Sequence, residues 1–141
     1  VMCQRLSDDL RRAGIRADCL HGDIKQATRE KTMADFRHGK LPVLIATDVA
    51  SRGIDVDDVD GVINYDVPEE NEYYIHRIGR TGRARKKGIS FTLLGSFPEK
   101  AKLDEIAKFA GFRIVPMIFD EYGCLVPAPA EEKHPTSRRR F

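Results

Sequence analysis

The chain has 141 residues, of which 41% are hydrophobic and 33% are charged, and its formal net charge is +2. This size and hydrophobic content suit one domain around a single core. The sequence contains no apolar run near the roughly 18 residues of a membrane span and no signal-peptide pattern at its start. We therefore expect a cytoplasmic protein without a membrane partner.

Cysteine usage argues against two further classes of protein. Cys3, Cys19 and Cys124 are far apart and form no CxxC pair, which disfavours a disulfide framework and a zinc site. We therefore expect no metal ligands in this chain, and we expect the three cysteines to pack in the interior.

The first half of the chain alternates helical and strand-like segments. Residues 1–14 have apolar side chains at helical spacing and end at Gly14, which predicts an amphipathic helix. Residues 15–21 predict a short strand, and residues 26–37 predict a second helix closed by Gly39. The chain begins directly in a helix that a strand normally precedes, so we expect it to lack the first strand of its sheet.

The second half continues the alternation. Residues 42–47, PVLIAT, form an unbroken apolar run that is typical of a central parallel strand. We expect strands at residues 61–67 and 88–94, the second of them buried, and helices from Asn71 onward and at residues 99–110. Together these segments predict an α/β fold with an open, mostly parallel sheet and helices on both faces.

The last part of the chain differs in composition. From Tyr122 onward it contains several prolines and shows no hydrophobic periodicity. We therefore expect one domain at residues 1–118 and a flexible tail with a basic end at residues 119–141.

Residues 74–83, YIHRIGRTGR, are the most distinctive stretch of the sequence. Gly79 and Gly82 each disfavour a helix interior by about 1 kcal/mol, so the segment should leave helical structure partway. Guanidinium groups stay charged and bind phosphate through two N–H groups at once, so arginines on such a turn indicate an anion site. The alternative is a solvated basic face, but a solvated helix does not require two glycines.

A second candidate site follows the apolar run. In open α/β sheets, ligands bind beyond the carboxyl ends of the strands, and here that end reads ATDVASRGIDV, residues 46–56. The alternative is a capped loop without a ligand, because Asp48 and Ser51 could both serve as helix caps.

These motifs resemble those of one protein family. HRIGRTGR resembles motif VI of the DEAD-box ATP-dependent RNA helicases, and ATDVASRGIDV resembles motif V. The resemblance implies a RecA-like fold and implies that Arg80 and Arg83 are arginine fingers that reach the γ-phosphate of ATP. It also implies that His76 and Arg77 contact motifs of a partner domain.

The same resemblance implies further binding residues. HGDIKQATRE, residues 21–30, is similar to the segment with which the family holds RNA. The resemblance assigns Gly53 and Asp55 to the nucleotide, and it assigns Gly22, Gln26, Arg29 and Thr47 to the RNA backbone, with little sequence specificity.

Two elements of ATP hydrolysis are missing from the sequence. It contains neither a GxxxxGK[ST] phosphate loop nor a DEAD sequence that could hold Mg²⁺. The resemblance therefore implies the second of two RecA-like domains, with the phosphate loop and the Mg²⁺ ligands on an N-terminal domain, and we expect the chain alone to be inactive. An RNA-binding or scaffold module without catalysis is the alternative, whereas His76 disfavours a DNA-directed motor.

Overall fold

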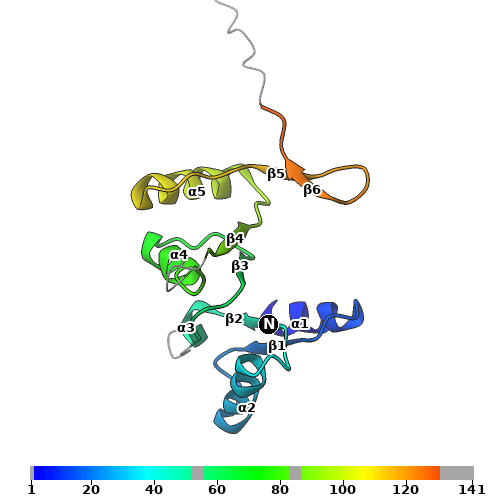
Figure 1. The fold of residues 1–141 in the computed structure, drawn as a ribbon. Helices are drawn as coiled ribbons and strands as arrows, with labels where there is room; N and C mark the ends of the chain where they lie inside the picture. Colours follow the sequence, from blue (N-terminus) through cyan, green and yellow to red (C-terminus); the bar gives the residue numbers. More distant parts are fainter. Residues whose placement is uncertain (1, 52–55, 83–86, 131–141) are drawn as a thin grey trace, which may run out of the picture. The chain divides into compact units, whose positions relative to one another are not determined.

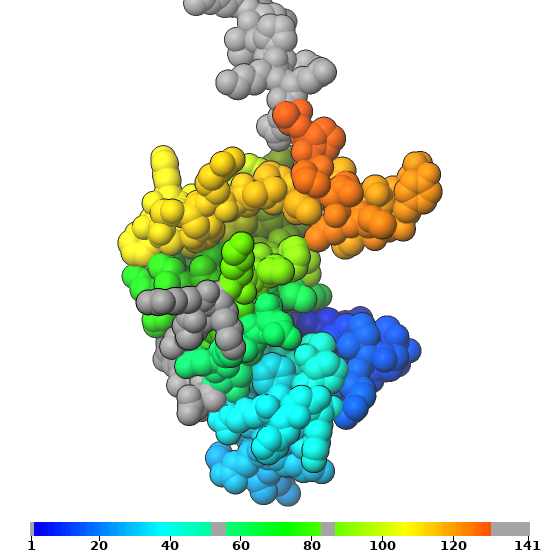
Figure 2. Space-filling model, in the orientation of Figure 1, coloured from blue at the N-terminus to red at the C-terminus, as the bar shows by residue number. Residues whose placement is uncertain are grey.

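The computed structural model describes residues 2–51, 56–82 and 87–130 (Figure 1). The chain divides into two compact units, Val1–Gly95 and Ser96–Phe141. Figure 2 shows the first unit in blue to yellow-green and the second in yellow to orange. Among the described residues, no helix combines the length and the apolar character that a membrane span requires.

The elements of the first unit alternate between helix and strand, as the sequence predicts. In chain order they are α1 (Met2–Arg12), β1 (Ala17–Leu20), α2 (Gln26–Arg37), β2 (Val43–Ala46), α3 (Asp48–Ser51), β3 (Gly61–Asn64), α4 (Asn71–Ile78) and β4 (Ile89–Thr92). The second unit contains α5 (Phe97–Ala110), β5 (Met117–Phe119) and β6 (Leu125–Pro127).

Glycines end the first two long helices, as predicted. Gly14 and Gly39 have φ angles of 83° and 74°, which L-residues with a side chain rarely adopt. At the end of α1 the amide of Gly14 donates to the carbonyl of Arg11 (3.0 Å) and the amide of Ile15 donates to that of Leu10 (2.9 Å). This pattern satisfies carbonyls that the helix leaves unpaired and turns the chain toward β1.

The strands of the first unit pair in parallel. β1 pairs with β2 from Ala17↔Val43 to Leu20↔Ala46. β3 pairs with β4 in a second parallel sheet. Helices α1 and α2 both pack on β1 (Figure 1). Parallel strands linked by helices confirm the predicted α/β class.

One prediction about the second sheet is wrong. We expected the strand at residues 88–94 to be buried, yet Ile89 and Phe91 in β4 are 56% and 41% exposed. Among the described strands β4 pairs only with β3, so its side chains have sheet neighbours on one side. An edge strand leaves more apolar surface exposed than the central strand that its composition suggested.

The core of the first unit lies against β1. Leu20, Met33, Ala50 and Val56 form a buried cluster, and Phe36, Leu44 and Val59 pack against it. Because Ala50 belongs to α3, this core fixes the short helix that follows β2.

Two of the three cysteines pack in this region, as expected. Cys3 in α1 and Cys19 in β1 are buried. Burial raises the pKa of the Cys19 thiol from its ordinary value of 9.0 to about 11. The expectation is wrong for Cys124, which is exposed.

The second unit differs from the expected tail. β5 and β6 pair as an antiparallel hairpin, with Ile118 opposite Val126. Between them the carboxylate of Asp120 accepts hydrogen bonds from the amides of Tyr122 (2.9 Å) and Cys124 (2.8 Å). The apolar strands flank a turn closed by aspartate and glycine, a signal that the high proline content obscured. The prediction for residues 131–141 lies outside the described residues.

Candidate nucleotide and RNA interface

The first site residues lie where β2 ends. The hydroxyl of Thr47 accepts a hydrogen bond from the amide of Ala50 (3.2 Å), so Thr47 caps the amino end of α3. The amide of Thr47 donates to the carbonyl of Leu20 (3.4 Å), which ties this end of β2 to the end of β1. Ser51 donates its hydroxyl to the carbonyl of Asp48 (2.8 Å). In the alternative of a capped loop, Asp48 and Ser51 were the possible caps, but the hydroxyl of Thr47 takes that position.

The carboxylate of Asp48 is held by Arg77 of α4 instead. Nε of Arg77 donates to Oδ1 of Asp48 and Nη2 donates to Oδ2, both at 2.7 Å. This bidentate pair joins two residues that are 29 positions apart. Two parallel charge-assisted hydrogen bonds fix distance and orientation more strictly than a single one.

Arg77 also reaches the segment after β3. Nη1 donates to the carbonyl oxygen (2.9 Å) and to Oδ1 of Asp66 (3.1 Å), and Nη2 donates to the same Oδ1 (3.1 Å). The hydrogen bond to Asp48 is the largest of the effects that raise the pKa of Arg77. The side chain of Arg77 is only 19% exposed. The expected contact of Arg77 with a partner domain would require it to give up bonds within its own domain.

The arginine turn begins directly after α4. The helix ends at Ile78, and Gly79 follows as its C-cap, which confirms that the glycines break the helix. Nη1 of Arg80 lies 3.5 Å from Oδ1 of Asp57, and the carbonyl of Arg80 accepts from the amide of Val59 (3.0 Å). The next residue, Thr81, donates its hydroxyl to the carbonyl of Val59. The turn is thus fastened to the segment before β3.

Side chains of α3 and α4, together with Arg80, enclose a hollow of about 530 Å³. Its lining residues are Asp48, Ser51, Tyr73, His76, Arg77 and Arg80. Two of these side chains are arginines: Arg77 is bonded to Asp48, and Nη1 of Arg80 lies 3.5 Å from Oδ1 of Asp57. Guanidinium groups can bind phosphate through two N–H groups at once, so this lining is a candidate anion site. Of the expected nucleotide-binding residues, Gly53, Asp55 and Arg83 lie outside the described residues.

A second group of expected residues gathers at the carboxyl ends of β1 and β2. Gly22 follows β1 and is exposed, and a Cβ added there would meet no atom within 4 Å. Nη2 of Arg29 in α2 donates to the carbonyl of Ala50 (2.6 Å), three residues beyond Thr47. The structure therefore places Arg29 beside the Thr47 cap. Gln26 is exposed and bonds to Glu30 along its own helix (3.1 Å).

Helix α3 stands between the two groups. Arg29 binds its third residue, Ala50, whereas Arg77 binds its first residue, Asp48. Sequence reasoning missed this link and also missed Asp57, Asp66 and Tyr73 as site residues. The acidic run at residues 55–72 was the available signal, but a run of charge does not say which carboxylate meets which arginine.

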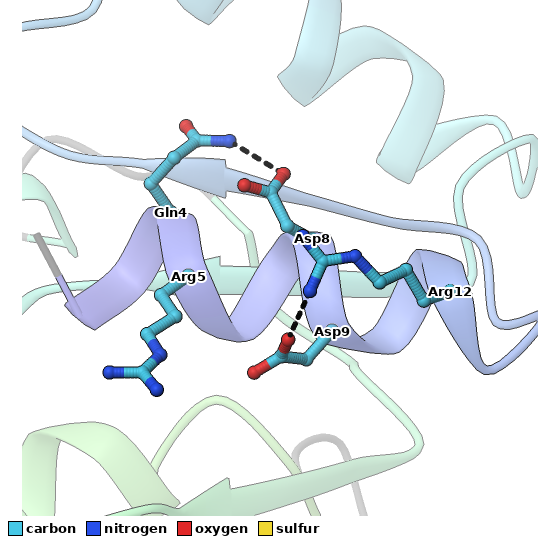
Figure 3. A pocket seen from close by; sticks show the side chains of 5 residues that line it. All are labelled: Gln4, Arg5, Asp8, Asp9 and Arg12. Carbon is cyan, nitrogen blue, oxygen red and sulfur yellow. Dashed lines mark hydrogen bonds and ion pairs between the residues drawn. The ribbon is translucent and has the colours of Figure 1, made fainter.

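A shallower hollow lies on the surface of α1, apart from these residues (Figure 3). There Gln4 bonds to Asp8 and Arg12 pairs with Asp9, each along the helix. The first of these bonds is partly buried and the second is exposed, and both join neighbouring turns of one helix, as is typical of a helix surface. Within the described residues no three His, Cys, Asp or Glu side chains gather as metal ligands would.

The sequence of this chain is similar to those of known helicases. The family described as helicase conserved C-terminal domain matches residues 1–85. The chain is 46% identical over 118 residues to the probable ATP-dependent RNA helicase DDX17 of Mus musculus, covering 82% of this chain and 18% of that protein. It is 50% identical over 112 residues to the ATP-dependent RNA helicase FAL1 of Saccharomyces cerevisiae, covering 79% of this chain and 28% of that protein.

The fold of this chain is also similar to that of a solved structure. S. cerevisiae Dbp5 bound to RNA and ADP BeF3 has a TM-score of 0.72 and 37% identity, over 78% of this chain and 30% of that chain. The chain belongs to the helicase conserved C-terminal domain family and is a RecA-like C-terminal domain of the DEAD-box type. It spans less than a third of the length of the two helicases named above.

Proposed function

We propose that this chain is the second RecA-like half of an ATP-dependent RNA helicase. In this role it supplies an arginine to the phosphates of ATP and part of the surface that holds the RNA backbone. The observation that carries the proposal is the hollow beside the arginine turn, which is lined by Arg80 and by Arg77, whose charge is matched by Asp48.

ATP supplies the phosphoryl group that is transferred to water. In this chain Arg80 would hold oxygens of the γ-phosphate, and we extend the role to Arg83 from its place in the same motif. A guanidinium can bind two phosphoryl oxygens and stabilise their charge as it redistributes. We propose Gly53 and Asp55 as further contacts to the nucleotide.

The Mg²⁺ ligands and the phosphate loop belong, in this proposal, to an N-terminal RecA-like domain. The described residues offer no carboxylate cluster for the metal. The chain alone should therefore bind ATP poorly and hydrolyse none.

RNA would lie along the carboxyl ends of β1 and β2. Arg29 keeps further N–H groups beyond the one bonded to Ala50, so it can hold a phosphate while it stays anchored. The exposed backbone at Gly22 leaves room for a close approach of the RNA strand. Thr47 would present its hydroxyl, and Gln26 its amide, to the same backbone. Contacts of this kind read shape and 2′-hydroxyls more than sequence.

Arg80→Lys in the two-domain protein tests the nucleotide role, with Arg12→Lys on α1 as the control. Arg12 is also an arginine, but its side chain is 78% exposed and pairs only with its helix neighbour Asp9 among the contacts that the structure describes. Arginine fingers contribute roughly 10³ to 10⁵ in rate, so Arg80→Lys should lower RNA-stimulated turnover by at least about a hundredfold and spare most RNA binding. Arg12→Lys should change neither.

The opposite result would distinguish an RNA-binding module from a helicase domain that contributes to ATP hydrolysis. If Arg80→Lys turned over ATP at a near-normal rate but lost RNA affinity, the arginine turn would be an RNA patch. The chain would then be better described as an RNA-binding module.

A further inference from the structure

The contacts of Arg77 point to a task that differs from those of its neighbours in the hollow. Among the residues that the structure describes, its five hydrogen bonds go to Asp48 and Asp66, which matches the five N–H donors of a guanidinium. One of these carboxylates begins α3 and the other follows β3. Arg77 therefore joins three segments of its own domain and keeps no donor for a ligand.

Helix α3 depends on such outside contacts. It has four residues, and a single helical turn is not stable by itself because nucleation fixes several backbone angles for one hydrogen bond. Its position is set by the cap from Thr47, by the burial of Ala50 and by the two arginines that hold it. Arg29 holds it from the side of the proposed RNA contacts, and Arg77 holds it from the hollow.

We propose that Arg77 is a positioning residue that couples RNA binding to ATP binding, through the clasp that it forms with Asp48 and Asp66. This inference rests on the proposed function, since it assigns the RNA to one side of α3 and the nucleotide to the other. A phosphate that draws Arg29 would pull on Ala50, and the clasp passes this displacement to α4 and the arginine turn. Without the clasp the RNA site and the nucleotide site still bind their own ligands, but binding of one ligand no longer changes the affinity for the other.

The measurement is the coupling factor between the two ligands in the two-domain protein. This factor is the ratio of the Kd of a non-hydrolysable ATP analogue without RNA to its Kd with a saturating single-stranded RNA. Linkage requires the same factor for RNA affinity with and without the analogue, which provides an internal check. Measured coupled sites typically show factors of about 5 to 150.

Arg77→Lys is the principal variant. A lysine keeps the positive charge but cannot bind both oxygens of Asp48 and also reach Asp66. We expect the coupling factor to fall toward 1. Asp48→Asn is a second variant, in which one acceptor oxygen becomes an N–H donor facing Nη2 or Nε, and it should lower the factor in the same way.

Arg11→Lys is the matched control. Arg11 also links a helix to other segments, through the carbonyl of Ala17 (2.8 Å) and the carboxylates of Asp8 (3.4 Å) and Asp18 (3.0 Å), but it lies on α1. Its replacement removes contacts between a helix and other segments of the same unit and should leave the coupling factor unchanged. Loss of coupling in all three variants would mean that general destabilisation is the cause, and it would overturn the proposal.

Two other outcomes would also overturn it. Unchanged coupling in folded Arg77→Lys and Asp48→Asn proteins would show that the clasp transmits nothing. An equal loss of analogue affinity with and without RNA would show that Arg77 contacts the nucleotide itself. If the proposed function itself is wrong, the unsubstituted protein will show no linkage between RNA and the analogue. This result differs from the two outcomes above, and it would overturn the inference as well.

Discussion

Gly88→Ala is expected to disturb the arginine turn, because Gly88 lies directly against it. A Cβ at residue 88 would lie 2.5 Å from the amide nitrogen of Gly82 and 2.7 Å from two side-chain atoms of Thr81. Real Cβ atoms essentially never lie closer than 3.0 Å to such atoms, so the turn or the start of β4 must move by at least about 0.5 Å. Thr81 cannot simply rotate away, because its hydroxyl is bonded to the carbonyl of Val59.

The magnitude follows from two opposing effects. Inserting a methyl group into a close-packed site costs about 1–3 kcal/mol, whereas replacing glycine by alanine gains about 0.4–1 kcal/mol by restricting the unfolded chain. The free energy of unfolding of Gly88→Ala should therefore fall by about 1.3 kcal/mol, the difference of the two mid-values, within a range of about 0–2.6 kcal/mol. The amide of Val59, which donates to the carbonyl of Arg80, should exchange its hydrogen faster because the displaced turn weakens that bond.

Urea unfolding measures the loss, and Gly61→Ala provides the control. A Cβ at residue 61 meets only the carbonyl oxygen of Ile89, at 3.5 Å, which is an ordinary contact. Gly61→Ala should leave the free energy of unfolding within about 0.5 kcal/mol of the starting protein or raise it. Equal stability of the two variants, with unchanged exchange at Val59, would refute the close approach on which this reasoning depends.

Two further predictions concern RNA affinity and pH. Gly22→Ala should leave the free energy of unfolding nearly unchanged, since a Cβ there meets no atom within 4 Å. It should weaken RNA binding in the two-domain protein, because the methyl group occupies the space proposed for the RNA backbone. Unchanged affinity in an RNA titration would remove Gly22 from the proposed RNA surface. The contribution of Cys19 to the free energy of unfolding should be present below about pH 9 and be lost as the pH rises toward 11, because burial raises the pKa of its thiol to about 11 in the folded chain and the unfolded chain loses this proton first. This contribution is at most about 2–3 kcal/mol. In urea unfolding at pH 8 and pH 10.5, the unsubstituted protein should therefore lose more stability between the two pH values than Cys19→Ala.

The sequence by itself determined the features that depend on near neighbours along the chain. Helix α2 begins at Gln26 and ends at Arg37 as predicted, and Gly14 and Gly39 close their helices. The departure from helix at Gly79 was likewise predictable. Each of these features depends on hydrogen bonds within about five residues and on the backbone freedom of glycine. Helical spacing and glycine positions are both visible in the amino-acid sequence.

Motif residues were recognisable for the same reason, but their partners were not. From the sequence, Asp48 and Ser51 were the candidate caps for this segment, whereas in the folded chain Thr47 caps α3. Arg77 lies 29 residues away in the chain, and its guanidinium takes the carboxylate of Asp48, which leaves the cap to the hydroxyl of Thr47. A charge-assisted bidentate pair is stronger than a single neutral cap, so the distant partner prevails over the local one.

Tertiary structure also decided which segments are covered. The composition of residues 88–94 suits a buried strand, yet β4 pairs only with β3 among the described strands and exposes Ile89 and Phe91. Near the other end, the apolar residues of β5 and β6 pair across a turn in a stretch whose prolines suggested a tail. Strand propensity describes which backbone conformations and environments a residue tolerates. Burial and strand pairing depend instead on which other segments lie beside it, and this is decided only when the chain folds.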